Sequence, residues 1–262
     1  MQDFKALSFT RQPSAIIVET DEPIQDSSLR ISHICRDNGL RLEDRQVDLL
    51  RRYVDLLRGW NARVNLISRR DEENIWWSHI LHSLSFLFFL QPGQGMRLLD
   101  LGTGGGLPGI PLAILRNDLH IVLLDSIRKK TAAVQEMAEQ LPLTNVRVET
   151  GRAEEVSSKS GFSGAFDIVV ARAVAPLEDL VRWSRPLLRG TKGKEVPHRL
   201  AHPAGRSLST PLLVALKGGD LSEEVRRAQQ KARSAVISAN TLVFPGSEEL
   251  GLEDKRLVTV EF

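Results

Sequence analysis

Cysteine is almost absent from this 262-residue sequence, in which Cys35 is the only one. A single thiol cannot form an internal disulfide and cannot supply a cysteine-rich zinc site, so both are excluded. A chain that uses neither suits a reducing compartment, and we expect a cytoplasmic protein.

Long apolar runs are missing as well. The most apolar segment, residues 75–90, is too short to cross a bilayer and contains His79 and His82. Residues 1–26 are mixed in charge and lack an apolar core followed by a cleavage site of small residues, so no signal peptide is expected. We therefore expect no membrane span.

A strong excess of one charge is also lacking, since 35 basic residues face 33 acidic ones and the formal net charge is +2. That balance is too mild to require a nucleic-acid partner. The basic residues nevertheless concentrate in segments 41–70, 128–130 and 189–206. One such run is usually a solvated surface, but three together make a polyanionic partner a reasonable expectation.

Glycine, by contrast, is concentrated in one stretch, residues 97–112, which reads RLLDLGTGGGLPGIPL. A short apolar run ends at Asp100, and the glycines that follow tolerate positive φ and leave space where a Cβ would meet a ligand. Pro108 and Pro111 suit the first turn of a helix. The stretch predicts a strand, a tight turn and a helix, with a ligand lying on the turn.

Two cofactor classes use such a turn. The residues from Gly104 to Gly109 fit the dinucleotide pattern G-x-G-x-x-G. The other candidate is the D-x-G-x-G-x-G turn of S-adenosylmethionine enzymes, which is matched by Asp100, Gly102, Gly104 and Gly106. We favour the second, because a dinucleotide turn starts close behind its strand and, counted from Gly102, its third glycine position is Leu107.

The next apolar run, residues 120–125, also ends in an acid, Asp125. A carboxylate at this distance from the glycine turn meets the ribose hydroxyls of nucleotides in doubly wound folds. Helix capping is the alternative role for Asp125, with Ser126 as a competing cap. The position supports a nucleoside ligand of either cofactor class.

Helical and strand patterns alternate after the turn, which predicts an α/β fold with a parallel sheet. Helices are expected at 43–58, ending at Gly59, and at 74–90, 131–140, 176–188 and 223–232. Further strands are expected at 146–150, 166–171 and 212–217, with an edge strand at 257–262. We divide the chain into a partly disordered extension (1–40), a helical portion (41–92) and an α/β domain (93–262) with an exposed basic loop at 191–210.

If the reaction is methyl transfer, the acceptor atom dictates what the site must contain. Carbon-5 of a pyrimidine needs a nucleophilic cysteine, and Cys35 lies outside the α/β domain. Exocyclic amines usually go with an Asp/Asn-Pro-Pro-aromatic turn after the fourth strand, where this chain has ARAVA from Ala171. A ring nitrogen such as guanine N7 already offers a free lone pair, so positioning can supply most of the catalysis.

Metal chemistry has little support in the sequence. His79 and His82 share a helix side, but no third ligand with a fitting pattern lies nearby, and we expect no metal site.

Several motifs occur together and in a specific order: WNAxxNL from Trp60, HILxS from His79, DLGTGGGLPGIPL from Asp100, LDS from Leu124, RAEE from Arg152, ARA from Ala171 and ALKG from Ala215. With them the chain resembles, from Leu40 to Phe262, the bacterial ribosomal RNA small subunit methyltransferase G family. The resemblance implies a class I S-adenosylmethionine-dependent methyltransferase fold with a seven-stranded, mostly parallel sheet. It also implies methylation of N7 of one guanine in 16S ribosomal RNA.

The resemblance further assigns site residues by position. Gly102, Gly104 and Leu107 would line the methionine end of the cofactor, Asp125 the ribose, and Ala153 and Glu154 the adenine side. Arg172 would serve both the cofactor and the target cleft, as the catalytic residue. Those near the cleft mouth, toward the RNA, would be Asn61, Asn65, His79 and Lys217.

Other readings of these residues remain open. Glu154 could only favour a helix N-terminus, Arg172 could form a surface ion pair, and Lys217 could simply end a strand. His82 departs from the family pattern, which usually has an acid there. Two rival functions are a non-catalytic protein that binds the ribosome and an NAD-dependent oxidoreductase. The partner we expect is 16S ribosomal RNA or the small ribosomal subunit, bound by a monomer.

Overall fold

A seven-stranded sheet forms the centre of the molecule in the computed structural model, which describes residues 24–172, 174–190, 195–196, 207–247 and 254–262. Its strands are β1 (Arg97–Leu101), β2 (His120–Asp125), β3 (Val146–Thr150), β4 (Ile168–Arg172), β7 (Leu212–Gly218), β8 (Val236–Thr241) and β9 (Lys255–Glu261). They lie in the order β3-β2-β1-β4-β7-β9-β8, and β9 alone runs antiparallel to its neighbours. This arrangement confirms the predicted class I methyltransferase fold.

The last strand is not at the edge, and that prediction was wrong. β9 lies between β7 and β8, and both of its faces are covered, because Leu257, Val258, Thr259 and Val260 are all buried. The edge strand at this end of the sheet is β8, whose sequence VISANT is half-exposed and carries small polar residues. Such a segment lacks the apolar alternation by which a strand is recognised in sequence.

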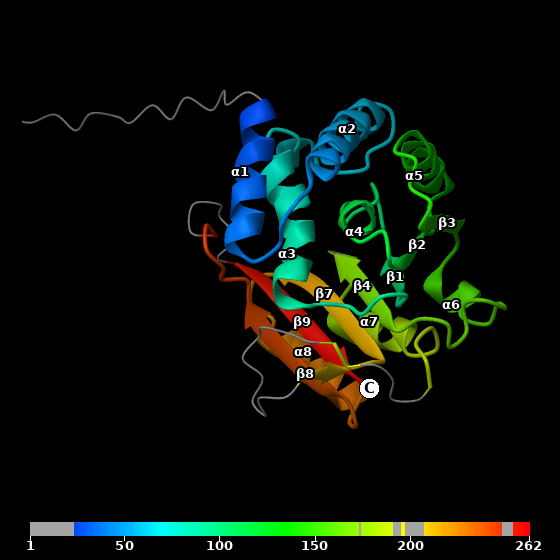
Figure 1. The fold of residues 1–262 in the computed structure, drawn as a ribbon. Helices are drawn as coiled ribbons and strands as arrows, with labels where there is room; N and C mark the ends of the chain where they lie inside the picture. The colour runs from blue at the N-terminus through cyan, green and yellow to red at the C-terminus, as the bar shows by residue number, and fades with distance from the viewer. Residues whose placement is uncertain (1–23, 173, 191–194, 197–206, 248–253) are drawn as a thin grey trace, which may run out of the picture.

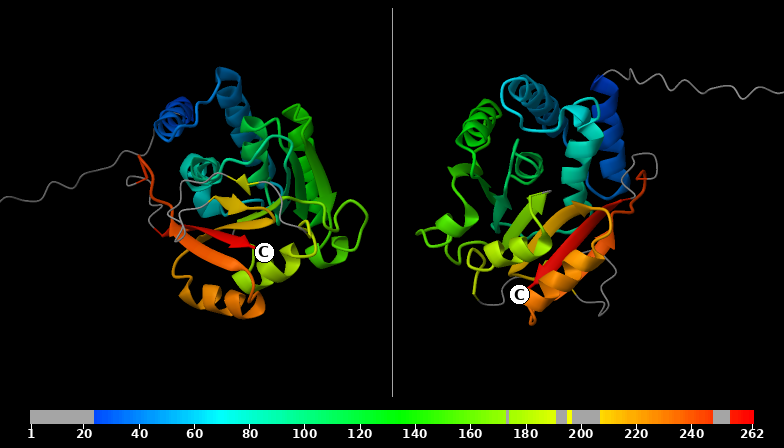
Figure 2. Two further views of the ribbon diagram at one scale, coloured as in Figure 1. Left: turned by 60° about the horizontal axis from the view of Figure 1, so that its bottom comes forward. Right: turned by 180° about the vertical axis from the view of Figure 1, so that it is seen from behind.

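Helices cover both faces of the sheet (Figures 1 and 2). One face carries α1 (Ile24–Asp37), α2 (Asp44–Asn61), a π-helical turn (Trp76–Leu81) continued by α3 (His82–Phe89), α4 (Gly109–Leu115) and α5 (Arg128–Gln140). The other face carries α6 (Ala153–Val156), α7 (Leu177–Ser184) and α8 (Ser222–Lys231). The helical portion therefore shares one hydrophobic core with the sheet.

Helix α1 lies inside the predicted disordered extension. Its residues Ile31, Ile34 and Cys35 are buried in the same core as α2 and α3, and the side chain of Asn38 donates to the carbonyl of Pro245 over 3.0 Å. The helical layer thus begins at Ile24 rather than near residue 41. The first 23 residues of the prediction lie outside the described part of the chain.

The predicted basic loop is also partly regular. A short antiparallel pair joins β5 (Glu195–Val196) to β6 (Leu208–Ser209), and Leu208 is buried. The rest of the predicted loop, residues 191–194 and 197–206, lies outside the described residues.

Helix α2 packs against the glycine turn. A capping box formed by Glu43 and Gln46 begins it, and it continues through Gly59 to Asn61, although the sequence predicts an end at Gly59. Its buried face includes Tyr53, whose hydroxyl donates to the carbonyl of Gly105 over 2.9 Å.

Among the described residues, no helix combines the length and apolar character that a membrane crossing needs.

Candidate cofactor and acceptor site

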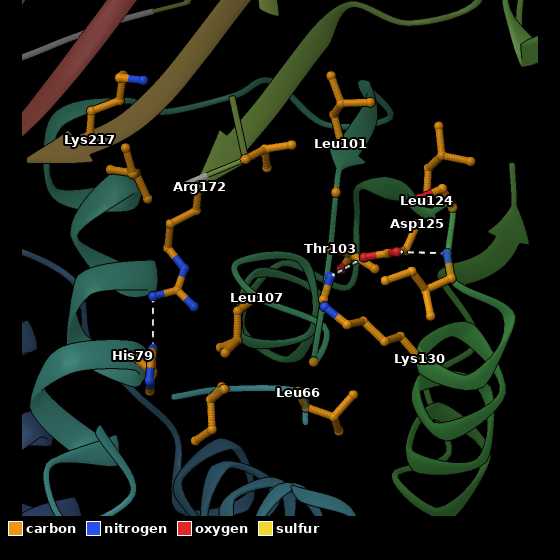
Figure 3. A pocket seen from close by; sticks show the side chains of 18 of the residues that line it. Leu66, His79, Leu101, Thr103, Leu107, Leu124, Asp125, Lys130, Arg172 and Lys217 are labelled. Carbon is orange, nitrogen blue, oxygen red and sulfur yellow. Dashed lines mark hydrogen bonds between the residues drawn. The ribbon is translucent and has the colours of Figure 1, made fainter. Parts of the chain in front are cut away.

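A cavity of about 830 Å³ opens at the carboxyl ends of β1, β2, β4 and β7 (Figure 3). It lies where the strand order reverses, because the chain runs from β1 to β2 and β3 on one side and then crosses to β4 on the other side of β1. Open α/β sheets bind ligands at such points. Of the residues predicted for the site, it brings together Gly102, Gly104, Leu107, Asp125, Ala153, Glu154, His79, Arg172 and Lys217. Asn61 and Asn65 do not line it.

The first half of the glycine turn faces this cavity. Gly102 and Gly104 have φ of +72° and +57°, which side chains rarely adopt. A Cβ at Gly104 would have only the carbonyl of Leu66 near it, at 3.6 Å, so the space beside it is open. The turn is therefore shaped for a ligand to approach the backbone at Gly104.

The remaining glycines allow close packing, and Gly105 does so while also lining the cavity. A Cβ at Gly105 would lie 2.8 Å from the Leu57 side chain of α2, and one at Gly106 would lie 2.5 Å from Ile110. At Gly109 it would lie 2.1 Å from Leu123 on β2. The density of glycine in this stretch thus reflects close approach to α2 and β2 as well as a cofactor.

Asp100 lies beneath the turn and holds it. The carboxylate is fully buried, and its Oδ2 accepts from the hydroxyl of Thr103 over 2.6 Å and from the amide of Gly109 over 2.9 Å. Burial raises the pKa of Asp100 to about 6, against the two hydrogen bonds, which lower it. The residue lies outside the cavity lining, so its part in the cofactor pattern is to shape the loop.

Asp125 lines the cavity and is hydrogen-bonded both to the glycine turn and to the segment before α5. Its Oδ2 accepts from the amide of Gly104 over 3.0 Å, and its Oδ1 accepts from the amide of Ile127 over 2.9 Å in the manner of a cap before α5. Each oxygen keeps a further lone pair, and the carboxylate lines the cavity beside the turn (Figure 3). Ile127, 48% exposed, and Ala153 add apolar surface to the same wall, next to the exposed Glu154.

Arg172 ends β4 and points toward the π-helical turn (Figure 3). Its Nη1 lies 2.8 Å from Nδ1 of His79, and Nε2 of His79 lies 3.6 Å from a carboxylate oxygen of Asp71. Burial, assisted by the charges of Arg172 and Lys255, lowers the pKa of His79 to about 3, so the ring is neutral and Nδ1 accepts. The guanidinium is therefore fixed by an imidazole, and no surface ion pair of Arg172 occurs among the described residues.

His82 lies one turn further and also lines the cavity. Burial, followed by the charges of Arg172 and Lys255, lowers its pKa to about 3 as well. Its Nε2 and the Nε of Arg172 are buried without a hydrogen-bond partner in the described part of the chain. Across the described residues, no group of three or more His, Cys, Asp and Glu side chains is placed to hold a metal.

Lys217, at the end of β7, is held on two sides. Its Nζ lies 2.7 Å from Oε2 of Glu224 and donates to the carbonyl of Ala175 over 2.9 Å. An ammonium has three donors, so one remains for the cavity that Lys217 lines. Lys217 therefore does not simply end a strand, since it joins Glu224 to the segment after β4 and lines the cavity.

Asn61 and Asn65 lie at a neighbouring groove of about 620 Å³, formed with Ala62, Arg63, Ser68 and Arg69. The side chain of Asn61 is engaged in the fold: its Oδ1 accepts from the amides of Leu66 and Ile67 over 2.8 and 2.9 Å, and its Nδ2 donates to Glu72. Asn61 thus shapes the turn that brings Leu66 and Ile67 to the cavity wall.

Several lining or supporting residues have no counterpart in the sequence prediction. They are Tyr53, Ile127, Val174, Trp183, Glu224 and Lys255. The only usable signal was the single tyrosine on the apolar side of α2. The others come from different elements, and nothing in their local sequence marks them.

Comparison with known proteins identifies relatives over most of the chain. A family model described as rRNA small subunit methyltransferase G matches residues 46–196. The protein named "Ribosomal RNA small subunit methyltransferase G" in Chlorobium luteolum is 38% identical over 86% of this chain and 83% of its own length. The protein of that name in Parabacteroides distasonis is 40% identical over 74% of this chain and 76% of its own.

The fold was also compared with solved structures. Aeropyrum pernix fibrillarin in complex with S-adenosyl-L-methionine has a TM-score of 0.44 at 13% identity, over 64% of this chain and 66% of that one. So weak a likeness adds nothing to the fold that the strand order establishes.

Proposed function

The chain belongs to the rRNA small subunit methyltransferase G family, and from that premise we propose that it transfers a methyl group from S-adenosylmethionine to N7 of a guanine in 16S ribosomal RNA. The substrate is the RNA alone or within the small ribosomal subunit, and the protein acts in the cytoplasm.

The observation that carries the proposal is the juxtaposition of the open glycine turn with Asp125 in one cavity. The wall at Gly102 and Gly104 suits the amino-acid end of the cofactor, because no side chain projects from it. The carboxylate of Asp125 suits the ribose hydroxyls, and Ile127 with Ala153 suits the adenine ring. The residues present therefore fit S-adenosylmethionine, which when bound supplies an electrophilic methyl group on a sulfonium.

The acceptor side of the cavity supplies hydrogen-bond donors, and the carboxylate of Asp71 there faces His79. Arg172 is aimed by His79 and lines the cavity, where a guanidinium suits an acceptor such as guanine O6. Both histidines are neutral at physiological pH because of their lowered pKa values. These groups can orient a guanine without removing a proton, and N7 needs no deprotonation before attack.

The guanine must reach this cavity outside a regular helix. The major groove of A-form RNA is deep and narrow, so a paired guanine hides its N7 there. We therefore place the target in an unpaired or distorted segment. The groove beside the cavity, with Arg63 and Arg69, suits the flanking phosphates, since neither arginine has an ion pair among the described residues.

In the deciding experiment, the protein is incubated with methyl-labelled S-adenosylmethionine and either small ribosomal subunits or naked 16S RNA. Reactions without the protein are the controls. We expect label in a single guanine, at N7, as mapped by chain cleavage specific for 7-methylguanine. Label at another atom would overturn the N7 assignment. Binding without transfer would favour a non-catalytic ribosome-binding protein, and binding of NAD in place of S-adenosylmethionine would favour an oxidoreductase.

A further inference from the structure

The segment that follows β4 closes one side of the cavity. Val174, the first described residue of this segment, packs directly on the cofactor turn: a Cβ at Gly102 would lie 2.6 Å from its Cγ2 and 2.7 Å from its Cγ1. Val174 also lines the cavity itself. The position of this segment therefore affects the cofactor turn and the acceptor space together.

Two side chains from other elements hold the backbone of this segment. Lys217 of β7 donates to the carbonyl of Ala175 over 2.9 Å. Glu224 of α8 accepts, through Oε2, from the amide of Leu177 over 3.0 Å. The same Oε2 lies 2.7 Å from Nζ of Lys217, so a single carboxylate oxygen joins the two anchors.

The amide of Leu177 needs such a partner because it begins α7. The residue before it, Pro176, has no side-chain group that could accept from the first turn of the helix. Glu224 lies 47 positions away in the sequence and takes over this capping role from a neighbouring helix. A carboxylate is favoured there also by the partial positive charge of a helix N-terminus.

We infer that Glu224 is a positioning residue: its carboxylate locks Lys217 and the start of α7 together and thereby sets residues 174–177 as the wall between the cofactor turn and the acceptor guanine. The inference rests on the proposed function for the identity of cofactor and acceptor. Glu224 lines the cavity, but the role inferred for it is indirect, because it holds the amide of Leu177 itself and the carbonyl of Ala175 through Lys217.

Burial makes this lock sensitive to charge. The side chains of Lys217 and Glu224 are only 11% and 25% exposed. Removing the carboxylate leaves a largely buried ammonium without its counter-ion and a helix amide without its acceptor. Replacing it with an amide removes the charge and keeps an oxygen that can accept from Leu177.

The test compares Glu224→Ala and Glu224→Gln with Glu223→Ala. Glu223 is the matched control, since it is the preceding residue of α8, is 69% exposed, and pairs with Arg226 over 2.8 Å away from the cavity lining. Three quantities are measured on the full chain: hydrogen exchange of the Leu177 amide, affinity for S-adenosylmethionine, and KM and kcat for the RNA. Thermal unfolding identifies any variant that fails to fold.

Glu224→Ala is expected to speed exchange at Leu177 about tenfold, since the amide loses its acceptor. It should also weaken S-adenosylmethionine binding and lower kcat/KM for RNA, each by roughly five- to tenfold, because the wall at Val174 shifts. Glu224→Gln should restore exchange and cofactor affinity to within about twofold of wild type while kcat/KM for RNA stays low, because Lys217 has lost its counter-ion.

The inference is overturned if Glu224→Ala changes only the melting temperature, or if Glu223→Ala changes exchange and kinetics to the same extent. A wild-type enzyme that methylates no ribosomal RNA would instead contradict the proposed function. In that case exchange at Leu177 still decides whether Glu224 holds the start of α7.

Discussion

Nη1 of Arg172 lies 2.8 Å from Nδ1 of His79, so a guanidinium at the end of β4 is aimed by a neutral imidazole on the π-helical turn. A lysine at position 172 would keep the positive charge but lose the planar fork that contacts His79 and that we propose also contacts the guanine. We expect Arg172→Lys to lower kcat about 100-fold with a change in S-adenosylmethionine affinity below about threefold. Single-turnover methylation and calorimetry measure the two quantities.

His79→Gln is the companion variant for that prediction. An amide oxygen can still accept from the guanidinium, so the variant should keep kcat within about tenfold of wild type. A different result would contradict the role of this contact. If kcat falls equally in Arg172→Lys and Arg172→Ala, and is unchanged in both His79→Gln and His79→Ala, then His79 does not aim Arg172.

Gly102 offers a test of the cofactor turn. Any side chain there meets a φ of +72° and would lie within 2.7 Å of both methyl groups of Val174. Gly102→Ala should therefore weaken S-adenosylmethionine binding by at least about tenfold, as strain of roughly 1–3 kcal/mol would. Titration calorimetry on the folded variant checks this.

Gly59→Ala is the matched control, because Gly59 lies inside α2 and has no atom within 4 Å of an added Cβ. That substitution should leave cofactor affinity unchanged and raise the unfolding free energy by up to about 1 kcal/mol. Normal affinity in Gly102→Ala would mean that the cofactor does not depend on the shape of this turn.

The sequence predicted the parallel strands well and the wall of the site poorly, for physical reasons. β2 is a short apolar run, and β2 and β3 start and end where the sequence predicts, while β1 continues one residue beyond Asp100, to Leu101. Local composition carries that information. Asp125 could be found because it ends such a strand, where a site in this kind of sheet must lie.

Glu224 and the glycines show why the rest could not be predicted. Glu224 stands in the sequence SEEVRRAQQK, which reads as an exposed charged helix, while its partners Leu177 and Lys217 lie on other elements. The glycine stretch looks like one device for binding a cofactor. Gly105 and Gly109 are in fact required by Leu57 and Leu123, contacts that only the tertiary fold creates.

Stability should fall on mild acidification, because both buried histidines resist protonation. Their pKa values of about 3 in the folded protein lie below the ordinary value of 6.5, so the unfolded chain binds more protons than the folded one between these limits. Asp100 has the opposite effect below about pH 6, since its folded pKa is raised from 3.8 to about 6. From pH 6 to 4, two histidines minus one aspartate leave a loss of roughly 1.4 kcal/mol per pH unit.

Urea unfolding between pH 4 and 7 measures this slope. His82→Gln removes one of the two histidines and should flatten the curve between pH 4 and 6. His120→Gln, an exposed residue at the start of β2, should leave the slope unchanged. A wild-type stability that rises from pH 6 to 4 would show that the two imidazoles are protonated as easily in the folded protein as in the unfolded chain, because the raised pKa of Asp100 would then act alone.

The pH dependence of the chemical step tests the mechanism itself. Attack by guanine N7 needs no general base, and the neutral His79 is a poor one because its pKa is lowered to about 3 and its Nδ1 already accepts from Arg172. The single-turnover rate of the wild type should then stay nearly flat from about pH 6.5 to 9, below the range in which guanine N1 or a lysine ordinarily titrates. Rapid-quench measurements at saturating S-adenosylmethionine and RNA give this rate without product release.

A logarithm of the rate that rises with unit slope across the window would mean that a deprotonation limits the reaction. Lys217, which Glu224 holds beside the cavity, would then be the group to test as the base, and transfer to a ring nitrogen would no longer explain the site.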